Sequence, residues 1–95
     1  MAQSQFYMKY LNKILKYIAD KPNDFFHRSD IMDNILFDKE NEEENETFTK
    51  LVKKLISDKY ILFKDEKYNA VKITESGLKF INESKGYTLK DKIAL

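Results

Sequence analysis

The sequence offers few side chains that could carry out catalysis, because it contains one histidine and no cysteine. Histidine is the side chain most often used as a general base, so His27 is the candidate for that role. Neither G-x-S-x-G, the pattern of a hydrolase nucleophile, nor H-E-x-x-H, that of a zinc protease, occurs in the chain. A lone histidine directly after Phe25 and Phe26 is more often a partly buried structural residue. We therefore expect no enzyme, no catalytic residue and no cofactor.

The densest group of possible metal ligands lies in residues 38–46, which carry six acidic side chains and one lysine. Carboxylate oxygens are ligands that Ca²⁺ prefers, but a calcium loop needs them at alternating positions around a glycine. This stretch has neither that spacing nor a glycine. The pattern predicts a solvated acidic turn with no bound metal.

The formal net charge of +1 is distributed unevenly along the chain. Residues 1–37 carry +1, residues 38–46 carry −5, and residues 47–95 carry +5. Arg28 is the one arginine among 17 basic residues, and arginine is the commonest reader of guanine edges. Any nucleic-acid binding should therefore rest mainly on lysine contacts with phosphates. An AT-rich genome would also enrich lysine, so composition alone does not establish such binding.

The length of 95 residues is enough for one domain, which we place over residues 1–95 with 88–95 as a C-terminal tail. A composition with 42% hydrophobic residues, two glycines and one proline is typical of a helix-rich globular chain. No apolar stretch approaches the roughly 18 residues of a membrane span, and the N-terminus lacks the apolar segment of a secretory signal. We expect a cytoplasmic protein that does not bind membranes.

The first half of the chain predicts two helices separated by an extended segment. The first helix spans residues 4–20, with Ser4 as its N-cap and Pro22 just beyond its end. Residues 25–28 should add to the edge of a sheet, and Ser29 should cap a short second helix. The apolar side chains of the two helices recur every three or four positions: Tyr7, Tyr10, Leu11, Ile14, Leu15, Ile18, Ile31, Ile35 and Leu36.

The middle of the chain predicts a third helix that ends near Ser57 and starts in the acidic turn. Asn41 and Asn45 are the candidates for its N-cap. Two stretches of aromatic and β-branched residues then flank the charged residues 64–67, which predicts a β-hairpin with an exposed tip. The apolar face of this helix is formed by Phe48, Leu51, Val52, Leu55 and Ile56. Three tyrosines outside the first helix are candidates for stacking on bases: Tyr60, Tyr68 and Tyr87.

The end of the chain predicts a fourth helix over residues 75–84. Thr74 precedes it as the N-cap, and Gly86 is the expected stop. We expect a further helical turn around Leu89 and Ile93.

The order helix, short strand, helix, helix, hairpin, helix resembles that of winged helix-turn-helix domains over nearly the whole chain. The most specific stretch runs from Val71 to Leu78, where the second hairpin strand enters a Thr-x-x-Gly helix start, as in small bacterial or phage regulators of this family. Thr74 can satisfy free N–H groups there, and Gly77 allows a close backbone approach. The resemblance implies an α+β, mostly helical fold with a three-helix core, a two-stranded wing and a C-terminal helix.

In DNA-binding members of this family, the exposed face of the third helix enters the major groove and the hairpin tip contacts backbone or minor groove. Carried onto this sequence, the resemblance implies the following nucleic-acid-binding residues: Thr47, Lys50, Lys53, Lys54, Ser57, Lys64 and Lys67. Four acids at the helix start depart from the pattern, because carboxylates repel phosphates: Glu42, Glu43, Glu44 and Glu46. A charged outer face is also common to any amphipathic helix.

Two functions fit these observations. The first is a small transcriptional regulator that binds duplex DNA and forms a homodimer through its first and last helices. A tyrosine-rich first helix and the apolar Leu89 and Ile93 would otherwise leave apolar surface in water. The alternative is a winged-helix module that binds a protein partner through the acidic helix start and does not bind DNA. We expect the regulator.

Overall fold

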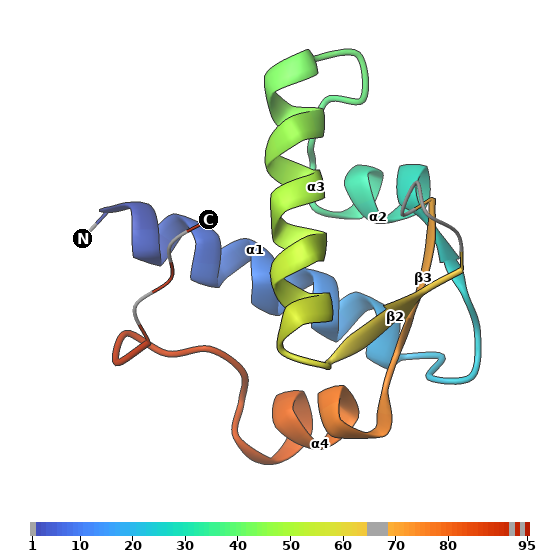
Figure 1. Ribbon diagram of the computed structural model, residues 1–95, viewed down its shortest axis with the longest axis vertical. Helices are drawn as coiled ribbons and strands as arrows, with labels where there is room; N and C mark the ends of the chain where they lie inside the picture. The colour runs from blue at the N-terminus through green and yellow to red at the C-terminus, as the bar shows by residue number, and fades with distance from the viewer. Residues whose placement is uncertain (1, 65–68, 92, 94) are drawn as a thin grey trace.

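Four helices and three short strands follow one another in the residues that the structure describes, which are 2–64, 69–91, 93 and 95 of a computed structural model (Figure 1). The elements in chain order are α1 (Ala2–Ala19), β1 (Phe26–His27), α2 (Arg28–Asn34), α3 (Glu42–Ser57), β2 (Ile61–Phe63), β3 (Ala70–Ile73) and α4 (Glu75–Glu83). The expected fold class, α+β and mostly helical, is confirmed.

The strands form one antiparallel sheet in the order β1-β3-β2. The predicted hairpin is β2 and β3, in which Ile61 lies opposite Ile73. The predicted extended segment is β1, which pairs with the other side of β3 so that Phe26 lies opposite Val71. The sheet therefore has three strands, one more than the two-stranded wing alone, because β1 occupies the free edge of β3.

Helix α1 is the centre of the packing, since it contacts α2, α3, α4 and β3. In the view of Figure 1, the start of α1 lies on the left together with the last described residues, and the sheet lies on the right. Among the described residues, no polar or charged side chain is buried. The fully buried core comes mainly from the predicted faces of the first three helices, and Met32 and Val71 join it: Leu11, Ile14, Leu15, Ile18, Ile31, Met32, Ile35, Phe48, Leu51, Val52, Leu55 and Val71. The expectation that Leu36 faces inward is wrong, because α2 ends at Asn34 and Leu36, with a φ of 64°, turns outward and is 84% exposed.

Helix α3 begins where its acidic residues begin. Asn41 is the N-cap, and its side-chain oxygen accepts a hydrogen bond of 3.0 Å from the backbone N–H of Glu44. Asn45, the second candidate, lies inside the helix and donates to the carbonyl oxygens of Lys39 and Asn41. Three glutamates in the first turn are favourable for the helix itself, because carboxylates near a helix N-terminus interact with its dipole.

Helix α4 starts as predicted. Thr74 is the N-cap, with Oγ1 accepting from the backbone N–H of Gly77 at 3.0 Å and donating to the carbonyl of Lys59 at 2.7 Å. A Cβ added at Gly77 would collide with the carbonyl oxygen of Tyr60. The predicted close backbone approach at this glycine is therefore confirmed, and it joins α4 to the start of β2.

Two predicted helix starts are wrong. Helix α1 begins at Ala2, so Ser4 lies within the helix instead of capping it. Helix α2 begins at Arg28, and its N-cap is His27, whose Nδ1 accepts from the backbone N–H of Ser29 at 3.1 Å. The pairing of β1 with β3 keeps the chain extended through His27, which places this residue at the cap. His27 has a structural role as expected, but its side chain is exposed and not partly buried.

The further helical turn expected near the C-terminus does not form in the described residues. Instead, Asp91 closes a tight turn by accepting from the N–H of Thr88 at 2.7 Å and donating its own N–H to the carbonyl of Thr88 at 2.9 Å. Ile93 is buried, whereas Leu89 is exposed. None of the helices in the described part of the chain has the length and apolar character of a membrane span.

Candidate nucleic-acid interface

The outward face of α3 carries three of the predicted residues together. Lys50, Lys53 and Ser57 follow one another at helical spacing and are all exposed. They lie on the side of the helix opposite Leu51 and Leu55, which are fully buried. The core face of α3 therefore fixes the direction in which these two ammonium groups and the hydroxyl point.

Two other predicted residues of α3 do not belong to this exposed group. Lys54 is half-buried, and its Nζ lies 3.0 Å from Oδ2 of Asp58 and 5.9 Å from the ring centroid of Tyr87. Thr47 is half-buried and lies seven residues before Lys54, on the same side of the helix. Lys54 is thus engaged in the packing of the C-terminal segment, and it lies apart from the exposed group of Lys50, Lys53 and Ser57.

The hairpin contributes Lys64, which is exposed at the end of β2. Its backbone N–H donates to the carbonyl of Ala70 at 2.8 Å, which continues the β2–β3 ladder by one residue. Lys67, the second hairpin residue predicted to contact nucleic acid, lies outside the described residues, as does Tyr68. Of the two hairpin lysines predicted to contact nucleic acid, Lys64 is therefore the one that the structure describes.

Arg28 connects the hairpin to α3, a role that the sequence pattern did not predict. Its backbone N–H donates to the carbonyl of Asn69 at 2.6 Å. Its guanidinium reaches 17 and 21 residues along the chain, where Nη2 donates to the carbonyl of Asn45 and to Oγ1 of Thr49, both at 2.8 Å. The guanidinium carbon also lies 4.9 Å from the ring centroid of Phe48. Arg28 thus links the start of α2 to the residue before β3 through its backbone and to the first half of α3 through its guanidinium.

A surface hollow of about 350 Å³ opens beside this arginine. Its lining combines cations, anions and neutral polar groups: Arg28, Glu42, Asn45, Glu46, Thr49, Lys50 and Lys53. Burial lowers the pKa of Arg28, but guanidinium stays protonated at any physiological pH. The hollow therefore places a permanent, oriented positive charge next to the two lysines of the α3 face.

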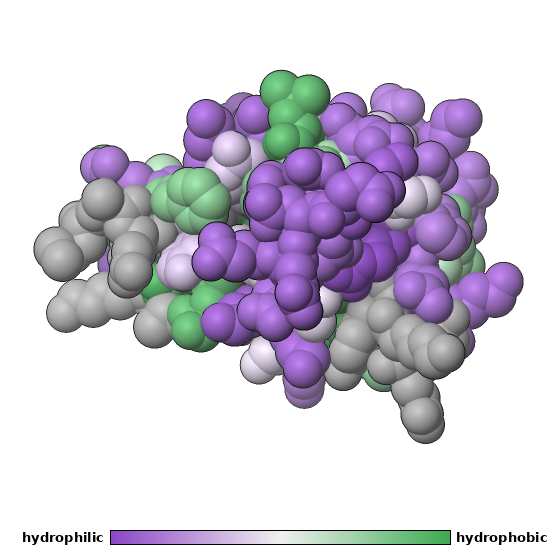
Figure 2. All heavy atoms as spheres, turned by 90° about the horizontal axis from the view of Figure 1, so that it is seen from above, coloured by the Kyte–Doolittle hydropathy of each residue, from purple (hydrophilic) through white to green (hydrophobic). Residues whose placement is uncertain are grey.

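Three of the four acidic residues at the start of α3 lie on the same side of the helix as Lys50 and Lys53. Glu42, Glu43 and Glu46 are exposed, whereas Glu44 is half-buried and accepts from the backbone N–H of Asp38 at 3.0 Å. Figure 2, which looks down on the end of the molecule where α3 begins, shows hydrophilic side chains across the centre of this face. The α3 surface is therefore divided, with carboxylates in its first two turns and ammonium groups in the next two.

Two of the tyrosines considered for base stacking, Tyr60 and Tyr87, are engaged inside the protein. Tyr60 stacks on Phe80 with ring centroids 4.2 Å apart, and Tyr87 is buried against both rings. Phe25, just before β1, is instead one of the exposed aromatic rings on the strand side of the molecule, together with Phe63 of β2. The short segment that contains Phe25 has no periodic apolar pattern, so the sequence did not indicate whether the ring of Phe25 is exposed or buried.

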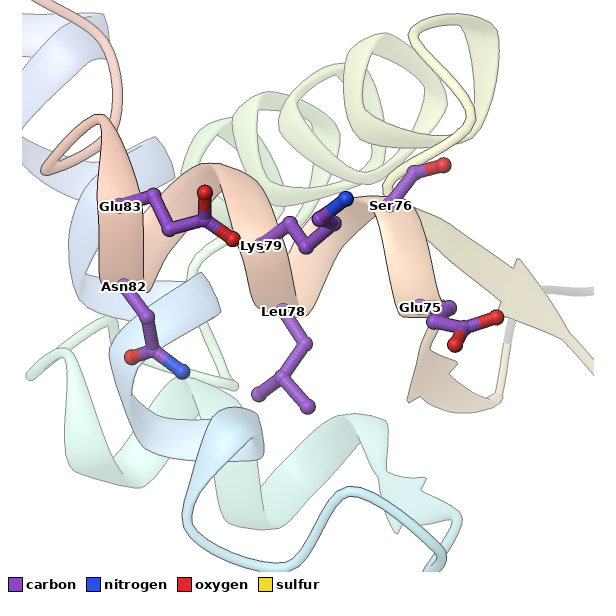
Figure 3. Close-up of a pocket in the computed structure, with 6 residues that line it drawn as sticks. All are labelled: Glu75, Ser76, Leu78, Lys79, Asn82 and Glu83. Carbon is purple, nitrogen blue, oxygen red and sulfur yellow. The ribbon is translucent and has the colours of Figure 1, made fainter.

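A surface hollow with a volume of about 610 Å³ lies beside α4. Figure 3 shows Leu78 and Asn82 pointing to one side of the helix, and Ser76 and Lys79 to the other. These side chains do not converge on one point, so they do not form a catalytic arrangement. Within the described ranges, no three histidine or acidic side chains are grouped in a way that could hold a metal ion.

Comparisons with protein families, with characterised proteins and with solved structures find no match to this chain. Function must therefore be inferred from the geometry and charge of the surfaces described above.

Proposed function

We propose that this chain is a winged helix-turn-helix protein that binds duplex DNA and acts as a small transcriptional regulator. The observation that carries the proposal is the exposed group of Lys50, Lys53 and Ser57 on one face of α3, directly before the β2–β3 hairpin. The order of elements is consistent with such a fold. In this arrangement, α3 would approach the major groove while Lys64 on the hairpin would reach the neighbouring backbone.

Arg28 supports the proposal because it supplies a positive charge whose direction is fixed before DNA arrives. Its bonds to Asn45 and Thr49 hold the guanidinium beside Lys50 and Lys53. A guanidinium presents several N–H donors in a plane and suits phosphate oxygens better than an ammonium group. We include Arg28 among the phosphate contacts, and we leave Lys54 out because it pairs with Asp58.

The proposal includes a cytoplasmic homodimer. Phe6 near the start of α1 is exposed and packs edge-on against Tyr7 and Tyr10. Leu89 in the C-terminal tail is 69% exposed. A second copy that covers these side chains would remove apolar surface from water.

The second candidate function is a protein-binding module. It is favoured by the exposed carboxylates of Glu42, Glu43 and Glu46. These carboxylates would repel DNA phosphates at the N-terminal end of α3, the part of the helix that contacts bases in DNA-binding proteins of this kind. A basic protein partner would be attracted to the same groups.

Changing these three glutamates to glutamine separates the two functions. For a DNA-binding protein, the variant should bind random-sequence duplex more tightly than the parent at low salt, because repulsion at the start of α3 is relieved. For a module that binds a basic protein, neither the parent nor the variant should bind duplex. Absence of binding in both proteins would overturn the DNA proposal. Glu44 stays unchanged, since its bond to Asp38 belongs to the fold.

A further inference from the structure

We propose that the outward face of the β1-β3-β2 sheet is a binding site for single-stranded nucleic acid, separate from the duplex surface proposed on α3. We call this surface the outer platform. It comprises six residues in two rows across the sheet: Phe25, Lys72 and Leu62, and His27, Ala70 and Lys64.

The register of the sheet determines which side chains share this face. Val71 and Ile73 are buried, so Lys72 between them points away from the core. Leu62 lies directly opposite Lys72, and side chains that lie opposite each other on paired strands point to the same side. Because Phe26 lies opposite Val71, the preceding Phe25 lies next to Lys72 on the outward side.

Contacts between the side chains agree with this register. The Nζ atoms of Lys72 and Lys64 lie 5.5 and 5.9 Å from the ring centroid of Phe25. Phe25 and Leu62 are each 43% exposed, although both are large apolar side chains. The outer platform therefore presents an aromatic ring with two ammonium groups around it, which is the combination that stacks on a base and neutralises the adjacent phosphates.

The charge of the outer platform favours an anionic partner. None of its six residues is acidic, and Lys64 and Lys72 carry positive charge. Among the described residues, the acidic side chains that flank it in the sequence are Asp24, Asp30 and Glu75. The start of α3 carries the opposite charge, so a phosphate chain would be directed to the sheet and away from that helix end.

A hollow of about 490 Å³ adjoins the outer platform on the side of α4. Leu62 and Lys72 form one wall, and Pro22 and Leu78 are apolar residues among the others. Its volume falls in the range of about 300 to 1,000 Å³ that is usual for small-molecule sites. If one base of a single-stranded nucleic acid stacks on Phe25, the hollow beside Leu62 has room for the neighbouring base.

The partner is single-stranded because the outer platform recognises the faces of bases. In a duplex, each base face is covered by the next base pair, and only edges and phosphates are exposed. Single strands can turn their bases outward onto an aromatic side chain. This selectivity distinguishes the outer platform from the lysine face of α3, which the proposed function assigns to duplex phosphates.

The test uses a fluorescent reporter at the ring itself. The chain contains no tryptophan, so Phe25→Trp creates a single tryptophan on the outer platform. Phe6→Trp is the matched control, since Phe6 is 44% exposed on α1 and distant in sequence. Oligothymidine and oligouridine of about ten nucleotides, a length within usual site sizes, should quench the Phe25→Trp protein in a saturable manner and leave the fluorescence of Phe6→Trp unchanged. The two oligomers show whether DNA, RNA or both are bound.

The lysines and the ring are tested separately. In the Phe25→Trp protein, the double substitution Lys64→Gln and Lys72→Gln should weaken binding. It should also lower the slope of log affinity against log salt by about 1.4, since each phosphate contact on a single strand contributes about 0.7 to that slope. Phe25→Leu in the otherwise unchanged chain keeps an apolar side chain but removes the ring. Its affinity for a fluorescein-labelled oligothymidine, measured by anisotropy, should fall at least about fivefold, because base–aromatic stacking contributes about 1 to 3 kcal/mol per base.

Three results would overturn the proposal. The first is no quenching of the Phe25→Trp protein at low salt, or equal quenching of the Phe25→Trp and Phe6→Trp proteins. The second is quenching by a blunt duplex as strong as that by the single strands. The third is a blue shift of Phe25→Trp emission that grows with protein concentration without any oligonucleotide, which would mean that a second copy covers the outer platform. Failure of duplex binding on α3 would leave these readouts unaffected.

Discussion

The hydroxyl of Tyr87 donates a hydrogen bond of 2.5 Å to Oδ2 of Asp58, the C-cap residue directly after α3. The backbone of Tyr87 is held at the same time by Asn12 of α1, which accepts from its N–H at 2.8 Å and donates to its carbonyl at 2.9 Å. One residue after α4 therefore connects the C-terminal segment to both α1 and α3. Asp58 also pairs with Lys54, so the same connection holds the ammonium group of Lys54 beside the C-terminal segment.

Removing the Tyr87 hydroxyl should destabilise the fold measurably. Hydrogen bonds to charged groups contribute about 1.5 to 3 kcal/mol, so Tyr87→Phe should lower the free energy of unfolding by about that amount in urea titrations. Tyr10→Phe is the control, because its hydroxyl bonds to no described residue and its ring packs on Phe37 in the same way without it. Equal stability of the two variants would show that the bond to Asp58 is unimportant.

Stability should also fall at high pH because of the same tyrosine. Burial, followed by the hydrogen bond to Asp58, raises the pKa of Tyr87 above its usual value of 10.0. The folded state thus keeps the phenol protonated, while the unfolded chain ionises near pH 10. The contribution is complete below about pH 10 and is lost as the pH rises further. Urea titrations between about pH 9 and pH 11 should show a steeper decline for the parent than for Tyr87→Phe, and parallel declines would contradict this assignment.

Gly77→Ala should destabilise the protein, although alanine is the better helix former by about 1 kcal/mol. The added Cβ would collide with the carbonyl oxygen of Tyr60, which belongs to the backbone and moves only with β2. We expect a loss of about 1 to 3 kcal/mol, as for other overpacked sites. Ser76→Ala, at an exposed neighbouring position of α4, should leave stability unchanged or slightly higher. A more stable Gly77→Ala protein would show that α4 does not approach Tyr60 this closely.

The buried face of α3 should carry much of the stability. Leu55→Ala and Leu51→Ala each remove a fully buried side chain, a change that costs about 2 to 5 kcal/mol. Leu36→Ala is the control, because Leu36 is 84% exposed. Thermal unfolding followed by circular dichroism should show large losses for the first two variants and almost none for the control. Parent-like melting of Leu55→Ala would mean that the wrong face of α3 has been assigned to the core.

The elements that the sequence predicted well are those whose signal is local. The apolar residues of α3 recur at helical spacing, and the hairpin strands flank four charged residues, so both were recognisable without tertiary information. Thr74 and Gly77 lie three positions apart in a pattern that specifies its own cap. These features depend on neighbours along the chain.

The features that were missed depend on residues distant in sequence. Arg28 bonds to Asn45, Thr49 and Asn69, and no spacing rule connects a lone arginine to such partners. The position of His27 as the α2 cap follows from the pairing of β1 with the distant strand β3. The exposure of Phe25 depends on the same pairing, which decides whether that ring points to the core or to water.

The salt dependence of duplex binding tests the central claim most directly. Each phosphate contact contributes about 0.9 to the slope of log affinity against log salt, so replacing Lys50 and Lys53 with glutamine should lower the slope by about 1.8. A variant with Lys16 and Lys79 changed to glutamine has the same net charge, and both positions are exposed on other helices. We predict that this control keeps the slope of the parent. Equal slopes for the two double variants, or no binding by the parent at low salt, would contradict the assignment of the α3 face to DNA.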